Sequence, residues 1–174
     1  MVAGLQMHLE RMNFMGHAQD HIAACGENVG KCLQIVFPGD PLAVRGALKT
    51  AMEFLRQLEI SQDECGPVEL VMAEAINNVI EHAYEGGSHG IVELSIEYRA
   101  GALLFVILDD GLPMPDGDAP TGHKHDLTCE VEDLPEGGFG WFLIRELTQD
   151  LRYTRTGSRN RLEFNIIPGI VGKA

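Results

Sequence analysis

The stretch Glu74-Ala-Ile-Asn-Asn78-Val-Ile-Glu-His82 decides the fold, because it sets three polar side chains beside the apolar stripe of one helix. Glu74, Asn78 and His82 follow at four-residue steps, so they share a face with a drift of about 40° per step. The apolar residues of this helix form a neighbouring arc: Val68, Val71, Met72, Ala75, Val79 and Ala83. We therefore expect the polar side chains at the edge of a core, where they suggest a metal and phosphate site.

Local signals place this helix after another one. Ser61 to Glu64 has the form of a capping box and predicts where the second helix begins, and Gly86-Gly87 predicts where it ends. Asp40 followed by Pro41 is a typical helix start, and the first helix is expected from Leu42 to about Leu58. A third helix is expected from Trp141 to about Thr148, after a glycine-rich turn.

Alternating or continuous apolar runs predict strands. The run Ala102 to Leu108 is apolar throughout, which is typical of a buried central strand. A tight turn at Ala100-Gly101 joins it to the strand before it, and a turn at Gly157 to Asn160 joins the last two strands. The other predicted strands are Cys32–Phe37, Ile91–Tyr98, Leu151–Thr156 and Leu162–Ile167.

Composition bounds the function classes. The chain has 174 residues, enough for one ordinary domain, and a net charge of −13 from 13 basic and 26 acidic residues. This charge argues against direct nucleic-acid binding. No apolar run is long enough to span a bilayer, and the first residues lack the layout of a signal peptide. The four cysteines form no CxxC pair, so we expect reduced thiols and a cytoplasmic protein.

Two segments have no clear period. Residues 1–30 are expected to be an extension, partly helical or flexible, outside an ordered domain at residues 31–170. There His17, His21 and Cys25 recur every four residues, but no second ligand pair supports a metal site, and a solvated helix or loose extension is favoured. Residues from about 112 to 137 are rich in Pro, Gly, Asp and His. So long an aperiodic stretch inside a domain suggests a functional lid.

Three motifs in this order are more specific than any one alone. They are the helix stripe, Asp109-x-Gly111 at a strand end, and the glycine-rich turn Gly138-Phe139-Gly140 before a helix. The stretches MAEAINNVIEHAY, ILDDGLPMP, GGFGWFLIRELTQDLRYTR and NRLEF resemble the ATP-binding domain shared by gyrase, Hsp90, histidine kinases and MutL, the GHKL superfamily. From about Cys32 to Pro168 the chain is similar to the bacterial anti-sigma-factor serine/threonine protein kinases of that superfamily.

The resemblance implies a fold and a set of ligands. The fold is an α/β (α+β) two-layer sandwich of the Bergerat type, a mixed and mostly antiparallel sheet with helices packed on one face. The cofactors are ATP and Mg²⁺. Asn78 corresponds to the residue that ligates Mg²⁺, a task suited to an amide oxygen, and Glu74 to the general base. Asp109 corresponds to the residue that accepts a hydrogen bond from the adenine amino group.

The remaining expected ligand contacts are mostly backbone contacts. Gly111 is expected to let the backbone approach the base, and Gly138, Phe139 and Gly140 to free backbone amides for phosphate at a helix N-terminus. His82 is left open between a contact near the phosphates and simple packing. The sequence departs from gyrase-like proteins at Pro113, where they carry a second glycine, and Lys124 is the only basic residue of the lid.

The resemblance also implies a function. We expect a cytoplasmic anti-sigma factor that binds a sigma factor and phosphorylates a small STAS-type antagonist, with a homodimer as an allowed state. The alternative is a catalytically weak or inactive module that binds ATP or ADP and regulates by contact, which the weakly basic lid favours. A histidine kinase fragment is disfavoured, because no phosphoacceptor histidine motif is present. A gyrase-type machine requires a further domain.

Overall fold

The computed structural model describes residues 19–21, 31–58, 60–84, 90–120 and 139–169. Helices and strands occur together in one unit, which confirms the expected α+β class. The elements are β1 (Gln19–His21), β2 (Lys31–Pro38), α1 (Pro41–Leu55), α2 (Gln62–Ala83), β3 (Ile91–Arg99), β4 (Ala102–Asp109), the 3₁₀ helix η1 (Pro115–Gly117), α3 (Phe139–Leu147), β5 (Gln149–Thr156) and β6 (Arg159–Ile166).

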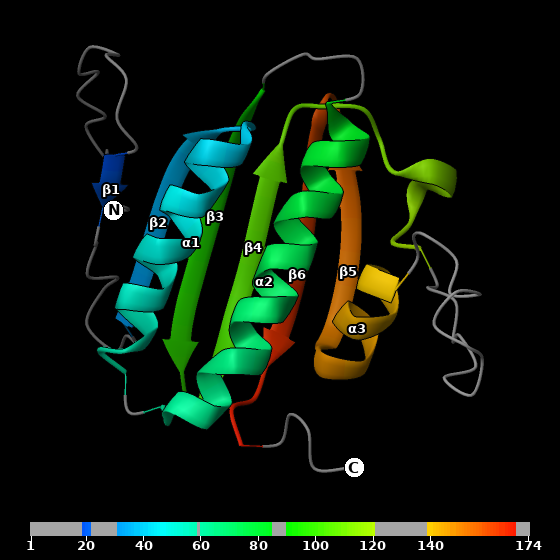
Figure 1. The fold of residues 1–174 in the computed structure, drawn as a ribbon. Helices are drawn as coiled ribbons and strands as arrows, with labels where there is room; N and C mark the ends of the chain where they lie inside the picture. The colour runs from blue at the N-terminus through cyan, green and yellow to red at the C-terminus, as the bar shows by residue number, and fades with distance from the viewer. Residues whose placement is uncertain (1–18, 22–30, 59, 85–89, 121–138, 170–174) are drawn as a thin grey trace, which may run out of the picture.

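The strands form one sheet in the order β1-β2-β3-β4-β6-β5. Every pairing among the described strands is antiparallel, and β4 lies in the interior of the sheet as its apolar run predicts. Figure 1 shows α1, α2 and α3 together on one face of this sheet. The predicted two-layer sandwich is thus confirmed.

The core lies between the helices and the sheet. Side chains of alternate strand residues point to this face, as the period of a strand requires. Phe105 of β4 and Phe164 of β6 are fully buried there and stack with ring centroids 5.2 Å apart. The predicted apolar arc of α2 is buried throughout, with each of its six residues at most 7% exposed. Burial of this arc fixes the rotation of α2, and with it the direction of Glu74 and Asn78.

Helix starts follow their local signals. The Asp40 carboxylate accepts hydrogen bonds from the backbone N–H of Leu42 and of Ala43, both at 3.0 Å. At the start of α2, Ser61 and Glu64 form the predicted capping box. Such caps satisfy amide groups that have no partner inside the helix.

Helix ends differ slightly from the prediction. Helix α1 ends at Leu55 because the chain then tightens: the N–H of Leu58 bonds to the carbonyl of Leu55, three residues back. Leu58 continues the apolar stripe and is buried even so. Helix α2 ends at Ala83, and Gly86-Gly87, the predicted stop, lies outside the described residues. Helix α3 runs from Phe139 to Leu147.

Two turns define the hairpins. Ala100 and Gly101 both have positive φ, 51° and 82°, which is the backbone of a two-residue turn between twisted strands. The predicted turn Gly157 to Asn160 is wrong at its second half, because Arg159 already pairs with Thr156 across β5 and β6. Asn160 is therefore a strand residue, and it lies opposite Asp109 of β4.

The two aperiodic segments are described in part. Residues 19–21 form the strand β1 against β2, so the helical spacing from His17 through His21 to Cys25 does not hold across them. His17 and Cys25 themselves lie outside the described residues, as do residues 121–138 of the predicted lid. Residues 112–120 of the lid contain the turn of η1. No described helix has the length and apolar content needed to cross a bilayer.

Candidate functional site

Helix α2 carries the first part of the site. Glu74 and Asn78 lie at the edge of the core, as predicted, whereas His82 is exposed. The amide nitrogen Nδ2 of Asn78 donates to the backbone carbonyl of Glu74 at 2.7 Å. This bond leaves the amide oxygen Oδ1 of Asn78 as the atom available to a ligand, and an amide oxygen is a type of ligand that Mg²⁺ accepts.

The beginning of α3 closes this part of the site. Helix α3 packs beside α2, and Gly140 lies directly against the side chains of Glu74 and Asn78. Trp141, the next residue, is only 5% exposed and belongs to the core. Gly138, the other glycine of the turn, lies outside the described residues.

Asp109 is the centre of the second part. Its carboxyl group is only 5% exposed at the end of β4. The oxygen Oδ1 accepts two hydrogen bonds, from the backbone N–H of Gly111 at 2.9 Å and from Nδ2 of Asn160 at 2.7 Å. Among the residues that the structure describes, these are the only hydrogen bonds of the group. The other oxygen, Oδ2, thus remains an acceptor for the amino group of a ligand.

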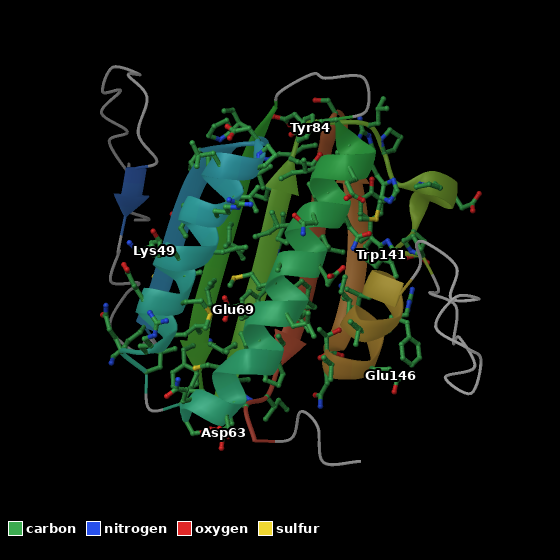
Figure 2. The ribbon with its side chains drawn as sticks, in the orientation of Figure 1. Lys49, Asp63, Glu69, Tyr84, Trp141 and Glu146 are labelled. Atoms are coloured by element: carbon green, nitrogen blue, oxygen red, sulfur yellow. The ribbon has the colours of Figure 1, made fainter. Side chains whose placement is uncertain are left out.

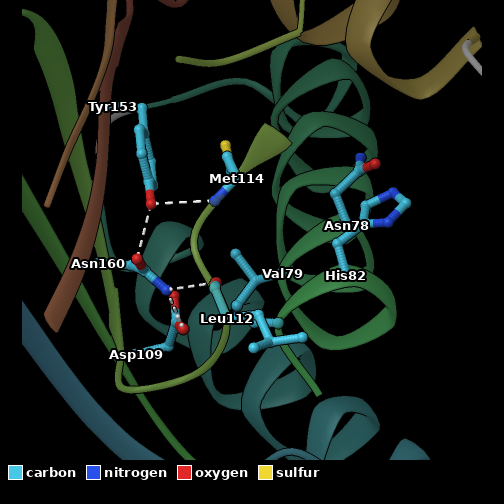
Figure 3. A pocket seen from close by; sticks show the side chains of 9 residues that line it. Asn78, Val79, His82, Asp109, Leu112, Met114, Tyr153 and Asn160 are labelled. Atoms are coloured by element: carbon cyan, nitrogen blue, oxygen red, sulfur yellow. Dashed lines mark hydrogen bonds between the residues drawn. The ribbon is translucent and has the colours of Figure 1, made fainter. Parts of the chain in front are cut away.

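Asn160 links Asp109 to the last two strands. Its Nδ2 also donates to the carbonyl of Leu112 at 2.9 Å, and its Oδ1 accepts from the hydroxyl of Tyr153 at 2.6 Å and from the guanidinium of Arg155. Figure 3 shows the chain of hydrogen bonds from Tyr153 through Asn160 to Asp109. The amide is satisfied at both ends, so it holds the Asp109 carboxylate in one orientation.

The surroundings of Asp109 raise its pKa above the ordinary value of 3.8. Burial is the largest cause, because it penalises the charged form. The hydrogen bonds from Asn160 and from the Gly111 backbone act in the opposite direction, and so does the positive charge of Arg155. The negative charge of Asp110 adds to the increase.

Gly111 ties the end of α2 to the segment after β4. A Cβ on Gly111 would lie 2.4 Å from the carbonyl oxygen of Ala83, a distance that real Cβ atoms do not show. The same carbonyl accepts the backbone N–H of Leu112 at 2.9 Å. Glycine at position 111 therefore allows the close approach of two backbones, and its predicted role near a base stays a prediction.

A small pocket lies between α2 and the sheet at this end. As the side chains stand, it has room for about one water molecule, so a purine base would require the lining to open. In Figure 3 the side chains of Asn78 and His82 extend from α2 away from Asp109, with Val79 and Leu112 between the two groups. The lining residues are Asn78, Val79, His82, Ala83, Asp109, Leu112, Met114, Tyr153 and Asn160.

Arg145 of α3 contacts the first part of the predicted lid. Its guanidinium donates to the carbonyls of Pro120 at 2.8 Å and Ala119 at 2.6 Å. It thereby holds the first part of the predicted lid against α3, and Ala119 is buried in the core. The lid residue Lys124 and three lid or loop histidines lie outside the described residues: His89, His123 and His125.

Sequence reasoning missed Asn160, Tyr153 and Arg155. The alternation of β6 carried a signal for the first of them, because Asn160 falls on the same face as the apolar residues Leu162, Phe164 and Ile166. A polar residue in such a series is expected to be buried and hydrogen-bonded. Both cysteines that the structure describes with their side chains, Cys32 and Cys65, are buried and form no disulfide.

The arrangement suits a ligand with an amino-bearing base and a charged tail. Asp109 offers a buried acceptor at one end of α2, and Glu74 and Asn78 face the first turn of α3, where helix amides favour an anion. The described residues contain no group of three or more His, Cys, Asp and Glu side chains that could hold a metal ion by themselves. A cation here therefore requires ligands from an anionic substrate or water besides Asn78.

Comparisons with known proteins place the chain in a family. Residues 37–166 match the family described as the histidine kinase-like ATPase domain. The anti-sigma F factor of Priestia megaterium is 29% identical over 108 residues, which cover 62% of this chain and 71% of that protein. The anti-sigma F factors of Geobacillus kaustophilus (strain HTA426) and Shouchella clausii (strain KSM-K16) are each 26% identical, over 59% of this chain and 68% of each relative.

Proposed function

This chain belongs to the histidine kinase-like ATPase domain family, and from that premise we propose that it is an anti-sigma factor with protein serine/threonine kinase activity. It binds a sigma factor and uses Mg-ATP to phosphorylate a small STAS-type antagonist. The names of the relatives support the anti-sigma role. The observation that carries the kinase role is the contact of Glu74 and Asn78 on α2 with Gly140 in the first turn of α3.

Asp109 forms the end of the site that binds adenine. The oxygen Oδ2 accepts the amino group of the base, while Asn160 and the Gly111 backbone hold Oδ1. Guanine has a carbonyl oxygen where adenine has its amino group, so an ionised carboxylate disfavours it. Burial strengthens this preference, because an unpaired polar group costs most where water is excluded.

Residues of α2 and α3 form the end of the site that binds the phosphates. Asn78 Oδ1 would be one oxygen ligand of Mg²⁺. The bound ion would neutralise part of the negative charge of the triphosphate. The backbone amides at the start of α3 hold phosphate oxygens. Glu74 accepts the proton of the attacking serine hydroxyl, because its carboxylate stands directly against this helix start.

A direct test uses the protein, γ-labelled Mg-ATP and candidate STAS-type antagonist domains. We expect transfer of the label to a serine or threonine of one antagonist. Asn78→Ala is expected to abolish Mg-ATP binding. Glu74→Ala is expected to keep binding and to reduce transfer by about 10²-fold or more. Retained transfer in the Glu74→Ala protein would remove the assignment of the base.

A second candidate is a module that holds ATP or ADP and regulates by contact alone. The hydrogen bonds of Arg145 favour this candidate. Its guanidinium binds the carbonyls of Ala119 and Pro120, so this cation is not directed at a phosphate in the structure. In the same assay this candidate predicts bound, intact nucleotide and no labelled antagonist. Binding of a sigma factor that depends on nucleotide distinguishes such a module from an inactive protein.

A further inference from the structure

Gly140 has no backbone reason to be glycine. It is the second residue of α3, and its φ lies outside the left-handed region that favours glycine. Glycine weakens a helix relative to alanine, because it loses more conformational freedom on folding. Some other property of this position must therefore account for the missing side chain.

Two side chains of α2 occupy the space where a Cβ would stand. A Cβ on Gly140 would lie 2.4 Å from Oε2 of Glu74, 3.4 Å from Cδ of Glu74 and 3.3 Å from Nδ2 of Asn78. All three atoms belong to side chains, and the shortest distance is to the carboxylate. The other helical glycines that the structure describes do not have such neighbours: at Gly46 in α1 and Gly66 in α2 the added Cβ would meet nothing within 4 Å.

We propose that Gly140 is a positioning residue for Glu74, a role that rests on the proposed function. The absent side chain keeps a space in which the Glu74 carboxylate stands against the first turn of α3. The partial positive charge of a helix N-terminus favours a carboxylate in that place. There the carboxylate lies one helical turn from Asn78, beside the position proposed for the terminal phosphate.

Alanine at position 140 is expected to move the carboxylate and to leave the helices in place. The atom in conflict is the far end of a flexible side chain, which can rotate away from the new methyl group. The contacts of Asp109 with Asn160 and Gly111 lie at the other end of the site and do not involve this methyl group. Gly140→Ala is therefore expected to lower the rate of the reaction and to leave the affinity for nucleotide nearly unchanged.

The experiment compares Gly140→Ala in two backgrounds, the natural Glu74 and the Glu74→Gln variant. Calorimetry with Mg-AMP-PNP gives the affinity, and single-turnover release of labelled phosphate from γ-labelled Mg-ATP, with water as acceptor, gives the rate. With Glu74 present, we expect a rate loss of about tenfold or more and an affinity change below about threefold. In the Glu74→Gln background, which has no base to displace, we expect a further rate loss below about twofold.

A matched control introduces the same methyl group elsewhere. Gly66→Ala on α2 adds a Cβ that meets nothing within 4 Å, so rate and affinity are expected to stay at the natural values. A crystal structure of Gly140→Ala supplies a measurement independent of activity. The expected result is a Glu74 carboxylate displaced from the start of α3, with α2 and α3 unmoved.

Three outcomes overturn the positioning role. One is an equal fractional rate loss with Glu74 present and in the Glu74→Gln background. Another is a loss of affinity of about tenfold or more, which would assign Gly140 to phosphate binding instead. The third is an unmoved carboxylate in the crystal structure of the variant. Failure of the proposed function has a different signature, because the unsubstituted protein would then release no phosphate, whether or not it binds Mg-AMP-PNP.

Discussion

The two oxygens of the Asp109 carboxylate have different surroundings, and this asymmetry supports the role that we propose for the residue. Asn160 and the Gly111 backbone hold Oδ1, whereas Oδ2 has no hydrogen bond within the described part of the chain. Burial raises the pKa of the group, so its ionised form costs free energy in the folded state. The protein retains an unfavourable charge at the place where a ligand's amino group is expected.

Asp109→Asn tests this cost. The new amide keeps an oxygen for Asn160 and Gly111 but presents a nitrogen donor in place of Oδ2. At pH 7 we expect ATP affinity at least about tenfold weaker, because two donors then face each other, and we expect a more stable folded state because the buried charge is removed. Calorimetry with ATP and thermal unfolding measure the two effects.

The pH dependence of that stability gain has a definite sign. The folded pKa of Asp109 is raised, so the natural protein binds the proton more tightly when folded than when unfolded. The cost of ionisation is absent below the ordinary value of 3.8 and fully present above the folded pKa. The gain from Asp109→Asn is therefore expected to grow as pH rises above 3.8 and to level off above the folded pKa. A gain that stays constant over this range would contradict the assignment.

At the scale of elements, glycines set how closely the end of α2 meets its neighbours. The ring of Tyr84, just after α2, lies against Gly39 and Gly90, and its hydroxyl donates to the carbonyl of Ile91 at 3.1 Å. Figure 2 shows Tyr84 at this end of α2. The N–H of Gly39 also bonds to the carbonyl of Gly90 at 2.8 Å. These contacts fix the helix end that leads into the pocket.

Gly90→Ala and Gly46→Ala are expected to change stability in opposite directions. A Cβ on Gly90 would lie 2.0 Å from the Tyr84 ring, so we expect a loss of about 1–3 kcal/mol through overpacking. At Gly46, inside α1, a Cβ meets nothing within 4 Å, and a gain of about 0.5–1 kcal/mol is expected. Urea unfolding of both variants measures this. Equal effects would show that the close approach of Tyr84 is not maintained in solution.

At the scale of the whole molecule, an acidic chain must hold an anion through local features. The net charge is −13, so the overall field repels a nucleotide. Under the proposed function, attraction is expected at the start of α3 and at Asn78, which would bind the triphosphate through a cation. Residues from α2, α3, β4, β5 and β6 contribute to the site, and a ligand that contacts several of these elements links them.

Mg-ATP is therefore expected to stabilise the folded chain. At a concentration 100 times Kd the linkage amounts to about 2.7 kcal/mol, or roughly 5–10 °C in Tm for a chain of this size. Asn78→Ala is expected to remove this shift, because the cation loses its protein ligand. Thermal unfolding with ATP, with and without Mg²⁺, makes the measurement. The absence of any shift in the natural protein would exclude nucleotide binding under those conditions.

Much of the architecture was predictable because its signals are local. The capping box at Ser61, the cap at Asp40 and the apolar run of β4 each depend on a few adjacent residues, and each prediction was confirmed. The predicted turn at Gly157 to Asn160 was wrong because two residues suffice to join β5 and β6. The four-residue spacing of His17, His21 and Cys25 is typical of a helix. Gln19–His21 instead form a strand, because they pair with β2.

By itself the sequence determined that Glu74 and Asn78 stand at the edge of a core and that Asp109 ends a buried strand, because periodicity and apolar runs set which residues are buried. Only the tertiary structure decided their partners. Asn160 is 51 residues from Asp109 and meets it through the pairing of β6 with β4. Gly140 meets Glu74 through the packing of α3 beside α2. Such contacts depend on how separate elements pack together, and no local pattern along the chain encodes that packing.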